Sequence, residues 1–262
     1  MKSPKNLWIA LAVVAVWLAI TIGGGHLQGG GHTELDELVK RGVLWALVAA
    51  LAFLAVMKSR LRWPDLGFEP ADWPSSLRLM WLPLLLIALM LGIAVTIGLP
   101  APAVLGWVLL NTVMVGISEE WAFRGFLLKG LSDRFSIRPA IWWCAALFGS
   151  THALNVLVTG HLGAGVQQAI AAAMSGLLFT VLRVRTRSLY PVMLLHTLWD
   201  FAVFVMVSSP QHSDAPGQAP SGTAGLLAPF IVVLPNFLYA LYLMRRAEHV
   251  TSLDATPNQP KE

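Results

Sequence analysis

The chain has 262 residues, of which 56% are hydrophobic and only 12% are charged. A soluble domain carries roughly a quarter charged residues, so this composition excludes an ordinary water-soluble globule and predicts a membrane protein of several helices. The formal net charge is +4, but the Lys and Arg residues stand in short clusters between apolar runs. Such clusters are typical of membrane orientation signals, and we expect no nucleic-acid partner. The single cysteine, Cys144, excludes an intramolecular disulfide.

Eight apolar runs, separated by loops that contain Pro, Gly or charged residues, define the expected fold. We predict an all-α, polytopic membrane protein with about eight transmembrane helices. The predicted spans are residues 7–22, 43–57, 79–99, 103–131, 137–158, 164–182, 189–207 and 225–244. Residues 1–78 hold two helices and a cytoplasmic loop, residues 79–207 hold helices three to seven, and residues 208–262 hold a loop, the eighth helix and a polar tail.

The basic residues are distributed unequally between alternate loops. Fifteen of the 18 Lys and Arg residues fall on one side of the predicted spans, and only Lys40 and Arg41 fall on the other, with Arg124 inside a span. Because cytoplasmic loops are enriched in Lys and Arg, this asymmetry predicts that the N-terminus and the C-terminus are both cytoplasmic.

Few ionisable residues lie inside the apolar runs, and each of them costs at least a few kcal/mol in a bilayer. Two belong together on one helix, Glu120 and Arg124. The other four are Glu119, His152, His196 and Asp200. At about 1.5 Å per helical residue, these four lie about 13–23 Å from the inner basic flanks. Their shared depth on three helices predicts one site.

Helical spacing assigns partners within this set. Glu120 and Arg124 are four residues apart, in the favourable order for an ion pair on one face. That pair leaves Glu119, about 100° round the helix, without a partner on its own helix. His196 and Asp200 are also four apart and point at one spot. Each assignment has an alternative. The ion pair could have a purely structural role, and His152 and His196 could serve only to hydrogen-bond neighbouring helices.

A carboxylate with two imidazoles at one depth suits the activation of water. Glu119 can take a proton from a water that His152 holds, while His196 stabilises the oxyanion of a cleaved amide. The same three side chains, Glu119, His152 and His196, are ordinary ligands for a divalent metal such as Zn²⁺. The spacing His-Glu-x-x-His is absent, so the sequence leaves open whether a metal cofactor is present.

Three motifs carry a resemblance to a known family. Glu119-Glu120-x-x-x-Arg124, Phe148-x-x-x-His152 and His196-x-x-x-Asp200 resemble those of the CPBP (Abi) family, the type II CAAX prenyl endopeptidases and their bacterial relatives. The resemblance implies that Glu119 activates water, that His152 assists, and that His196 and residue 200 stabilise an oxyanion. It implies supporting roles for Glu120, Arg124 and Phe148. The family's third motif often ends in Asn, whereas this chain has Asp200, and the family leaves a glutamic or a metallo mechanism open.

We therefore expect an intramembrane endopeptidase of the CPBP type, whose partners are the lipid bilayer and a protein or peptide substrate presented at the membrane. The resemblance to bacterial relatives places it in a bacterial inner or plasma membrane. Two alternatives use the same buried residues differently. A transporter or proton relay would move protons through the carboxylates and histidines, and a non-catalytic immunity or scaffold protein would not need them.

Overall fold

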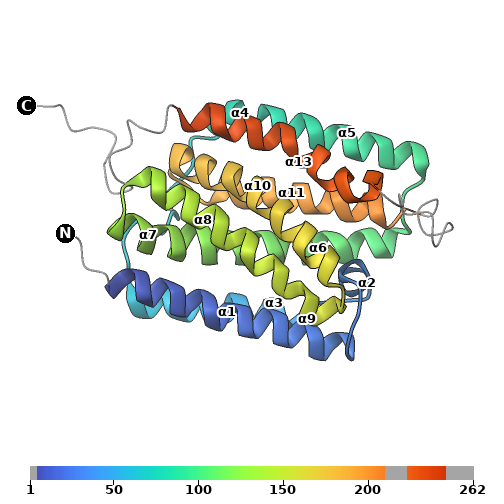
Figure 1. Ribbon diagram of the computed structural model, residues 1–262, viewed down its shortest axis with the longest axis horizontal. Coiled ribbons are helices and arrows are strands. Elements are labelled where there is room, and N and C mark those ends of the chain that lie inside the picture. Colours follow the sequence, from blue (N-terminus) through green and yellow to red (C-terminus); the bar gives the residue numbers. More distant parts are fainter. Residues whose placement is uncertain (1–4, 210–222, 246–262) are drawn as a thin grey trace, which may run out of the picture.

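The computed structural model describes residues 5–209 and 223–245, and these residues form helices and no strand. The helices run roughly side by side along the long axis of the molecule, with α1 (Lys5–Gly29) and α3 (Trp45–Leu61) forming one outer layer (Figure 1). The opposite layer contains α5 (Trp81–Ile97) and α13 (Thr223–Met244). The beginning of α1 and the end of α13 lie at the same end of the bundle.

The helices between these two layers carry the residues of the predicted site. They are α6 (Pro102–Glu120), η1 (Trp121–Leu127), α7 (Leu128–Arg134), α8 (Ile137–His152), α10 (Leu162–Thr186) and α11 (Tyr190–Val207). Within this layer α10 packs on α8 and α11 packs on α6, while α1 covers η1 and α7 from outside. The site is therefore enclosed by helices from both halves of the chain.

The prediction of eight spans is confirmed only in its coarser form, as a helical protein with several apolar helices. Among the described residues, six helices are long and apolar enough to cross a membrane. A seventh results if α4 (Trp73–Leu79) and α5, which bend by 69° at their junction, count as one span. The α3 helix has 17 residues, about 25 Å at 1.5 Å per residue, whereas a typical span needs about 20 residues. The predicted orientation of the termini stays a prediction. The predicted loop and polar tail within residues 208–262 fall largely on residues 210–222 and 246–262, which lie outside the described residues.

Local structure departs from the predicted helices at four places. The loop before the second predicted helix contains a short helix, α2 (Leu35–Lys40). The loop before the third contains α4, which Asp72 caps by accepting a hydrogen bond from the backbone N–H of Ser75. The fifth predicted helix passes through a 3₁₀ turn, η2 (Ala153–Asn155), into α9 (Val156–Thr159). The fourth, predicted as one α-helix, contains the π-helical segment η1, and such segments occur frequently at functional sites.

Candidate active site

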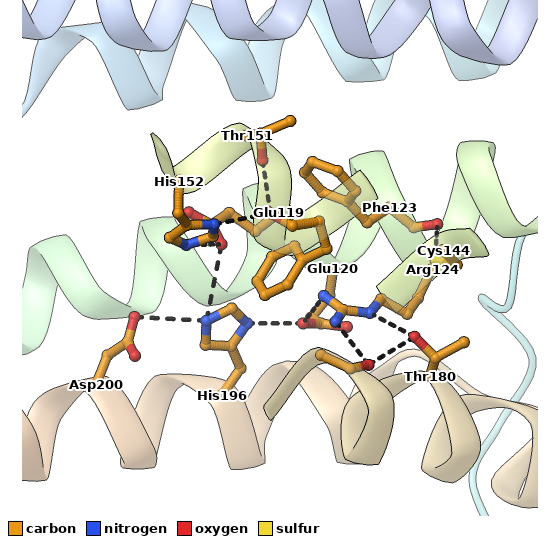
Figure 2. Close-up of polar contacts among 12 residues, drawn as sticks. Glu119, Glu120, Phe123, Arg124, Cys144, Thr151, His152, Thr180, His196 and Asp200 are labelled. Carbon is orange, nitrogen blue, oxygen red and sulfur yellow. Dashed lines mark hydrogen bonds and ion pairs between the residues drawn. The ribbon is translucent and has the colours of Figure 1, made fainter. Parts of the chain in front are cut away.

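The predicted site residues come together in the centre of the bundle (Figure 2). Glu119 and Glu120 end α6, and Arg124 lies in η1. His152 ends α8, whereas His196 and Asp200 lie on α11. Figure 2 shows His196 between Asp200 on one side and Glu120 on the other. The shared depth that the sequence predicts thus corresponds to direct proximity in space.

Glu120 is the centre of a closed polar network. Its Oε1 accepts a hydrogen bond from Arg124 Nη1 at 2.8 Å and lies 2.6 Å from His196 Nδ1. Since a carboxylate is an acceptor, the imidazole donates here from Nδ1–H. Glu120 and Arg124 are fully buried and His196 is nearly so. The predicted ion pair is present, but the contact between His196 and Glu120 is one that the sequence analysis did not predict.

The helix α10 completes this network, although sequence analysis assigned it no site residue. Arg124 Nη2 donates to the carbonyl of Gly176 at 3.1 Å, and Arg124 Nε donates to Thr180 Oγ1 at 3.3 Å. The Phe179 ring stacks on the His196 imidazole, with centroids 4.7 Å apart. Gly, Thr and Phe are ordinary in membrane helices, so their pattern gives no signal by which this contribution could be found.

Phe148 packs against the same network from α8. The Arg124 guanidinium carbon lies 4.0 Å from the centroid of the Phe148 ring, which is the geometry of a cation–π contact. The ring also meets His152 edge-on at 4.7 Å and His196 at 6.0 Å. Phe148 therefore contacts Arg124, His152 and His196, and its supporting role stays a prediction.

Glu119 lies on the other side of His196, in an open arrangement. Its Oε2 is 3.9 Å from His152 Nε2 and 3.8 Å from His196 Nε2. His196 Nε2 also lies 3.5 Å from Asp200 Oδ2. These distances exceed those of good hydrogen bonds, and Glu119 Oε2 is buried with no hydrogen-bond partner in the described protein. Glu120 Oε2 is also buried without a hydrogen-bond partner, but Glu120 is held through its Oε1, which contacts both Arg124 and His196. Glu119 has only the longer contacts given above.

A backbone carbonyl fixes the tautomer of His152. His152 Nδ1 lies 2.9 Å from the carbonyl oxygen of Phe148, which also accepts the Thr151 hydroxyl. A carbonyl only accepts, so Nδ1 carries the proton and Nε2 presents a lone pair toward Glu119. The four-residue spacing of the second motif places this carbonyl where it orients the imidazole.

The distances between Glu119 Oε2 and the two histidine Nε2 atoms can be compared with those between the ligands of a bound zinc ion. Four ligands around Zn²⁺ lie about 2.0–2.2 Å from the ion, hence roughly 3.3 Å from one another, whereas the Glu119–histidine gaps are 3.8 and 3.9 Å. Within residues 5–209 and 223–245, no group of three or more His, Cys, Asp or Glu side chains is arranged to hold a metal ion. Because the arrangement does not fit, the chemistry below is derived from the side chains alone.

Comparison with known proteins agrees with the three motifs. Residues 101–202 match the family described as type II CAAX prenyl endopeptidase Rce1-like. This segment begins with α6 and contains every site residue named above, so the recognition of the CPBP family is confirmed over it. The wider boundaries of the predicted core, residues 79–207, stay a prediction. Comparisons with curated proteins and with solved structures gave no match.

Proposed function

Because residues 101–202 form an Rce1-like domain, we propose that this multi-pass membrane protein is an intramembrane endopeptidase that hydrolyses a peptide bond with a water activated by Glu119. One observation carries the proposal. A buried carboxylate oxygen with no hydrogen-bond partner faces the Nε2 atoms of two imidazoles, at 3.8 and 3.9 Å. Two hydrogen bonds of about 2.8 Å that meet at one water molecule span a gap of this size when the angle between them is about 85–90°.

The first step is the formation of the nucleophile. Glu119 accepts one proton of the water, while His152 Nε2 accepts a hydrogen bond from the other O–H and so orients the oxygen. The hydroxide oxygen attacks the carbonyl carbon of the scissile peptide bond, and the carbonyl π electrons move to oxygen. The product of this step is a tetrahedral oxyanion beside a protonated Glu119.

His196 is placed to stabilise that oxyanion. Its Nδ1–H donates to Glu120, and its Nε2 lies on the open side near Glu119 and Asp200. With Glu119 protonated, the carboxylates of Glu120 and Asp200 provide the counter-charge for an imidazolium, and the imidazolium Nε2–H donates to the developing negative charge. Asp200 orients this N–H from 3.5 Å.

The intermediate then collapses with cleavage of the C–N bond. Glu119 returns its proton to the departing nitrogen, which leaves as an amine, and the carbonyl carbon becomes a carboxylic acid. Glu120 and Arg124 exchange no proton in this scheme. Their role is to hold His196 in place, since both are fully buried behind it.

We propose a protein or peptide segment presented at the membrane as the substrate, and a bacterial inner or plasma membrane as the location. The test compares membranes from cells that carry the wild type, Glu119→Gln or Glu34→Gln. Glu34 is the matched control, because it also pairs with a histidine, His161 at 3.2 Å, but lies exposed on the surface. We expect at least one membrane protein to accumulate unprocessed with Glu119→Gln only.

A farnesylated peptide that ends in a CAAX sequence provides the corresponding assay on purified protein. Cleavage by the wild type and by Glu34→Gln, with loss in Glu119→Gln, supports the proposal. Identical membrane proteomes in all three strains, together with proton flux through wild-type liposomes that Glu119→Gln abolishes, would support the proton-relay alternative instead.

A further inference from the structure

We propose that α10 supplies a positioning shell for the active site, formed by Gly176, Phe179 and Thr180. The inference rests on the proposed function and adds to it three residues that belong to none of the motifs. Phe179 acts on His196 directly, whereas Gly176 and Thr180 act through Arg124 and Glu120. All three are buried or nearly so.

Phe179 fixes the plane of the His196 ring. The two rings stack with centroids 4.7 Å apart and an interplanar angle of 24°. Phe148 meets the same imidazole edge-on from another side, at 80°. Because Phe179 contacts the face of the His196 ring and Phe148 meets it edge-on, the ring cannot rotate about χ2 without losing both contacts. The ring is thereby kept with Nδ1 on Glu120 and Nε2 toward Glu119.

Thr180 and the Gly176 carbonyl fix the guanidinium of Arg124. The Thr180 hydroxyl donates to the Gly176 carbonyl at 2.7 Å and accepts from Arg124 Nε at 3.3 Å. Arg124 Nη2 donates to the same carbonyl at 3.1 Å. The planar fork of Arg124 is therefore bound on its α10 side at two of its nitrogens. Its remaining nitrogen, Nη1, is directed at Glu120.

Gly176 is required for this arrangement for steric reasons. A Cβ atom at position 176 would lie 2.7 Å from a carbon of the Phe148 ring and 3.2 Å from Arg124 Nη2. The absence of a side chain lets the α10 backbone approach the guanidinium closely enough to accept its hydrogen bond. Small residues serve the same purpose at other contacts between membrane helices.

Thr180→Val tests the shell, because it keeps the shape of the side chain and removes only the hydroxyl. With the farnesylated peptide as substrate, we expect kcat to fall about 10- to 100-fold, as for small misplacements of catalytic groups, with KM within about twofold. Thr180→Ser keeps the hydroxyl and should retain near wild-type kcat. The control is Thr96→Val on α5, whose hydroxyl bonds the carbonyl of Ile93 on its own helix.

A second readout does not depend on catalysis. The Nδ1–H proton resonance of His196 reports its hydrogen bond to Glu120 and is assigned by its disappearance in His196→Gln. We expect Thr180→Val and Phe179→Leu to shift or broaden this resonance, and Thr180→Ser and Thr96→Val to leave it in place. Phe179→Leu serves as the independent variant should Thr180→Val fail to fold.

The two readouts separate the shell from the proposed function. If the wild type cleaves nothing, the resonance alone decides whether α10 positions His196. If the wild type cleaves the peptide, the proposal requires kcat and the resonance to change together in Thr180→Val and in Phe179→Leu. An unchanged resonance in both variants, or an unchanged kcat beside an altered resonance, overturns it.

Discussion

The two adjacent carboxylates of the first motif have opposite surroundings. Glu120 is fully buried and bonded to Arg124 and His196 at 2.8 and 2.6 Å. Glu119, one residue earlier, has 15% of its side chain exposed and no polar neighbour closer than 3.8 Å among its ion-pair partners. The side of the site around Glu120 is thus a hydrogen-bonded network, here called the closed side, whereas the side around Glu119, here called the open side, has only contacts longer than good hydrogen bonds. His196 belongs to both, through its two ring nitrogens.

This contrast shows how a membrane protein can hold an uncommitted carboxylate in its interior. The closed side compensates its charges within itself, so it can fix His196 without involving Glu119. The Glu119 carboxylate then needs only to face His152 and His196 across gaps of 3.8–3.9 Å. We expect variants on the open side to lower activity with little effect on stability. Variants on the closed side should lower activity through the position of His196, and those that leave a buried charge unpaired should also lower stability.

Replacement of Glu119 by Gln gives the largest expected effect. The amide cannot accept a proton from water, so we expect the cleavage rate of the farnesylated peptide to fall about 10²–10⁴-fold. The unfolding midpoint in detergent should stay near that of the wild type, because the buried Oε2 of Glu119 has no hydrogen-bond partner to lose. A Glu119→Gln protein that cleaves at the wild-type rate would remove the basis of the mechanism.

Glu120→Gln tests the closed side. The substitution leaves the buried Arg124 without its counter-charge, and breaking a buried ion pair in this way costs about 3–5 kcal/mol. We expect a correspondingly lower unfolding midpoint in denaturant titrations in detergent micelles. The double variant Glu120→Gln/Arg124→Met carries no uncompensated charge and should regain part of the loss. Equal stability of Glu120→Gln and the wild type would contradict the structural role.

Asp200→Asn sharpens the description of the open side. Asn is the more usual residue of the family at this position, and its amide N–H can donate to an oxyanion. Since Asp200 is 23% exposed and 3.5 Å from His196, we expect activity to change by less than about tenfold, or about 1.4 kcal/mol. Asp200→Ala, measured in the same peptide assay, should lose more. Equal rates for the wild type, Asp200→Asn and Asp200→Ala would exclude an electrostatic role for residue 200.

Much of the closed side could be predicted because its signals are local. The Glu120–Arg124 pair follows from a four-residue spacing, and the cost of burying charges identifies the few residues that need a reason to be there. The contact between Glu120 and His196 joins residues 76 positions apart, and helix packing alone determines it. The contribution of Gly176 and Thr180 depends on how closely α10 approaches Arg124, which no local pattern encodes.

The fold was predictable to a similar degree. Apolar runs and Pro or Gly boundaries gave the helices of the central layer to within a few residues. The π-helical segment Trp121–Leu127 and the 69° bend between α4 and α5 were not predicted. Both are deviations from regular geometry that packing against neighbouring helices stabilises, so composition and periodicity carry little information about them.

Trp17→Phe tests a hydrogen bond between α1, which lies outside the matched residues 101–202, and α6, which carries Glu119. The Trp17 indole N–H on α1 donates to Ser118 Oγ at 2.7 Å, directly before Glu119, and both groups are buried. Phe keeps most of the ring but leaves the Ser118 hydroxyl without this donor. We expect a loss of about 1 kcal/mol in the free energy of unfolding, with a smaller effect on the cleavage rate. Trp8→Phe, at an exposed position of the same helix, is the control and should change neither.

The smallest expected effect is that of metal removal. The oxygen of Glu119 and the imidazole nitrogens are 3.8–3.9 Å apart, wider than the roughly 3.3 Å between ligands of a tetrahedral zinc ion, whereas a hydrogen-bonded water fits between them. We therefore expect dialysis against a chelator to leave the cleavage rate unchanged and elemental analysis to find less than one zinc per chain. Stoichiometric zinc that is lost together with activity, and that His152→Ala fails to bind, would show instead that the open side closes around a metal.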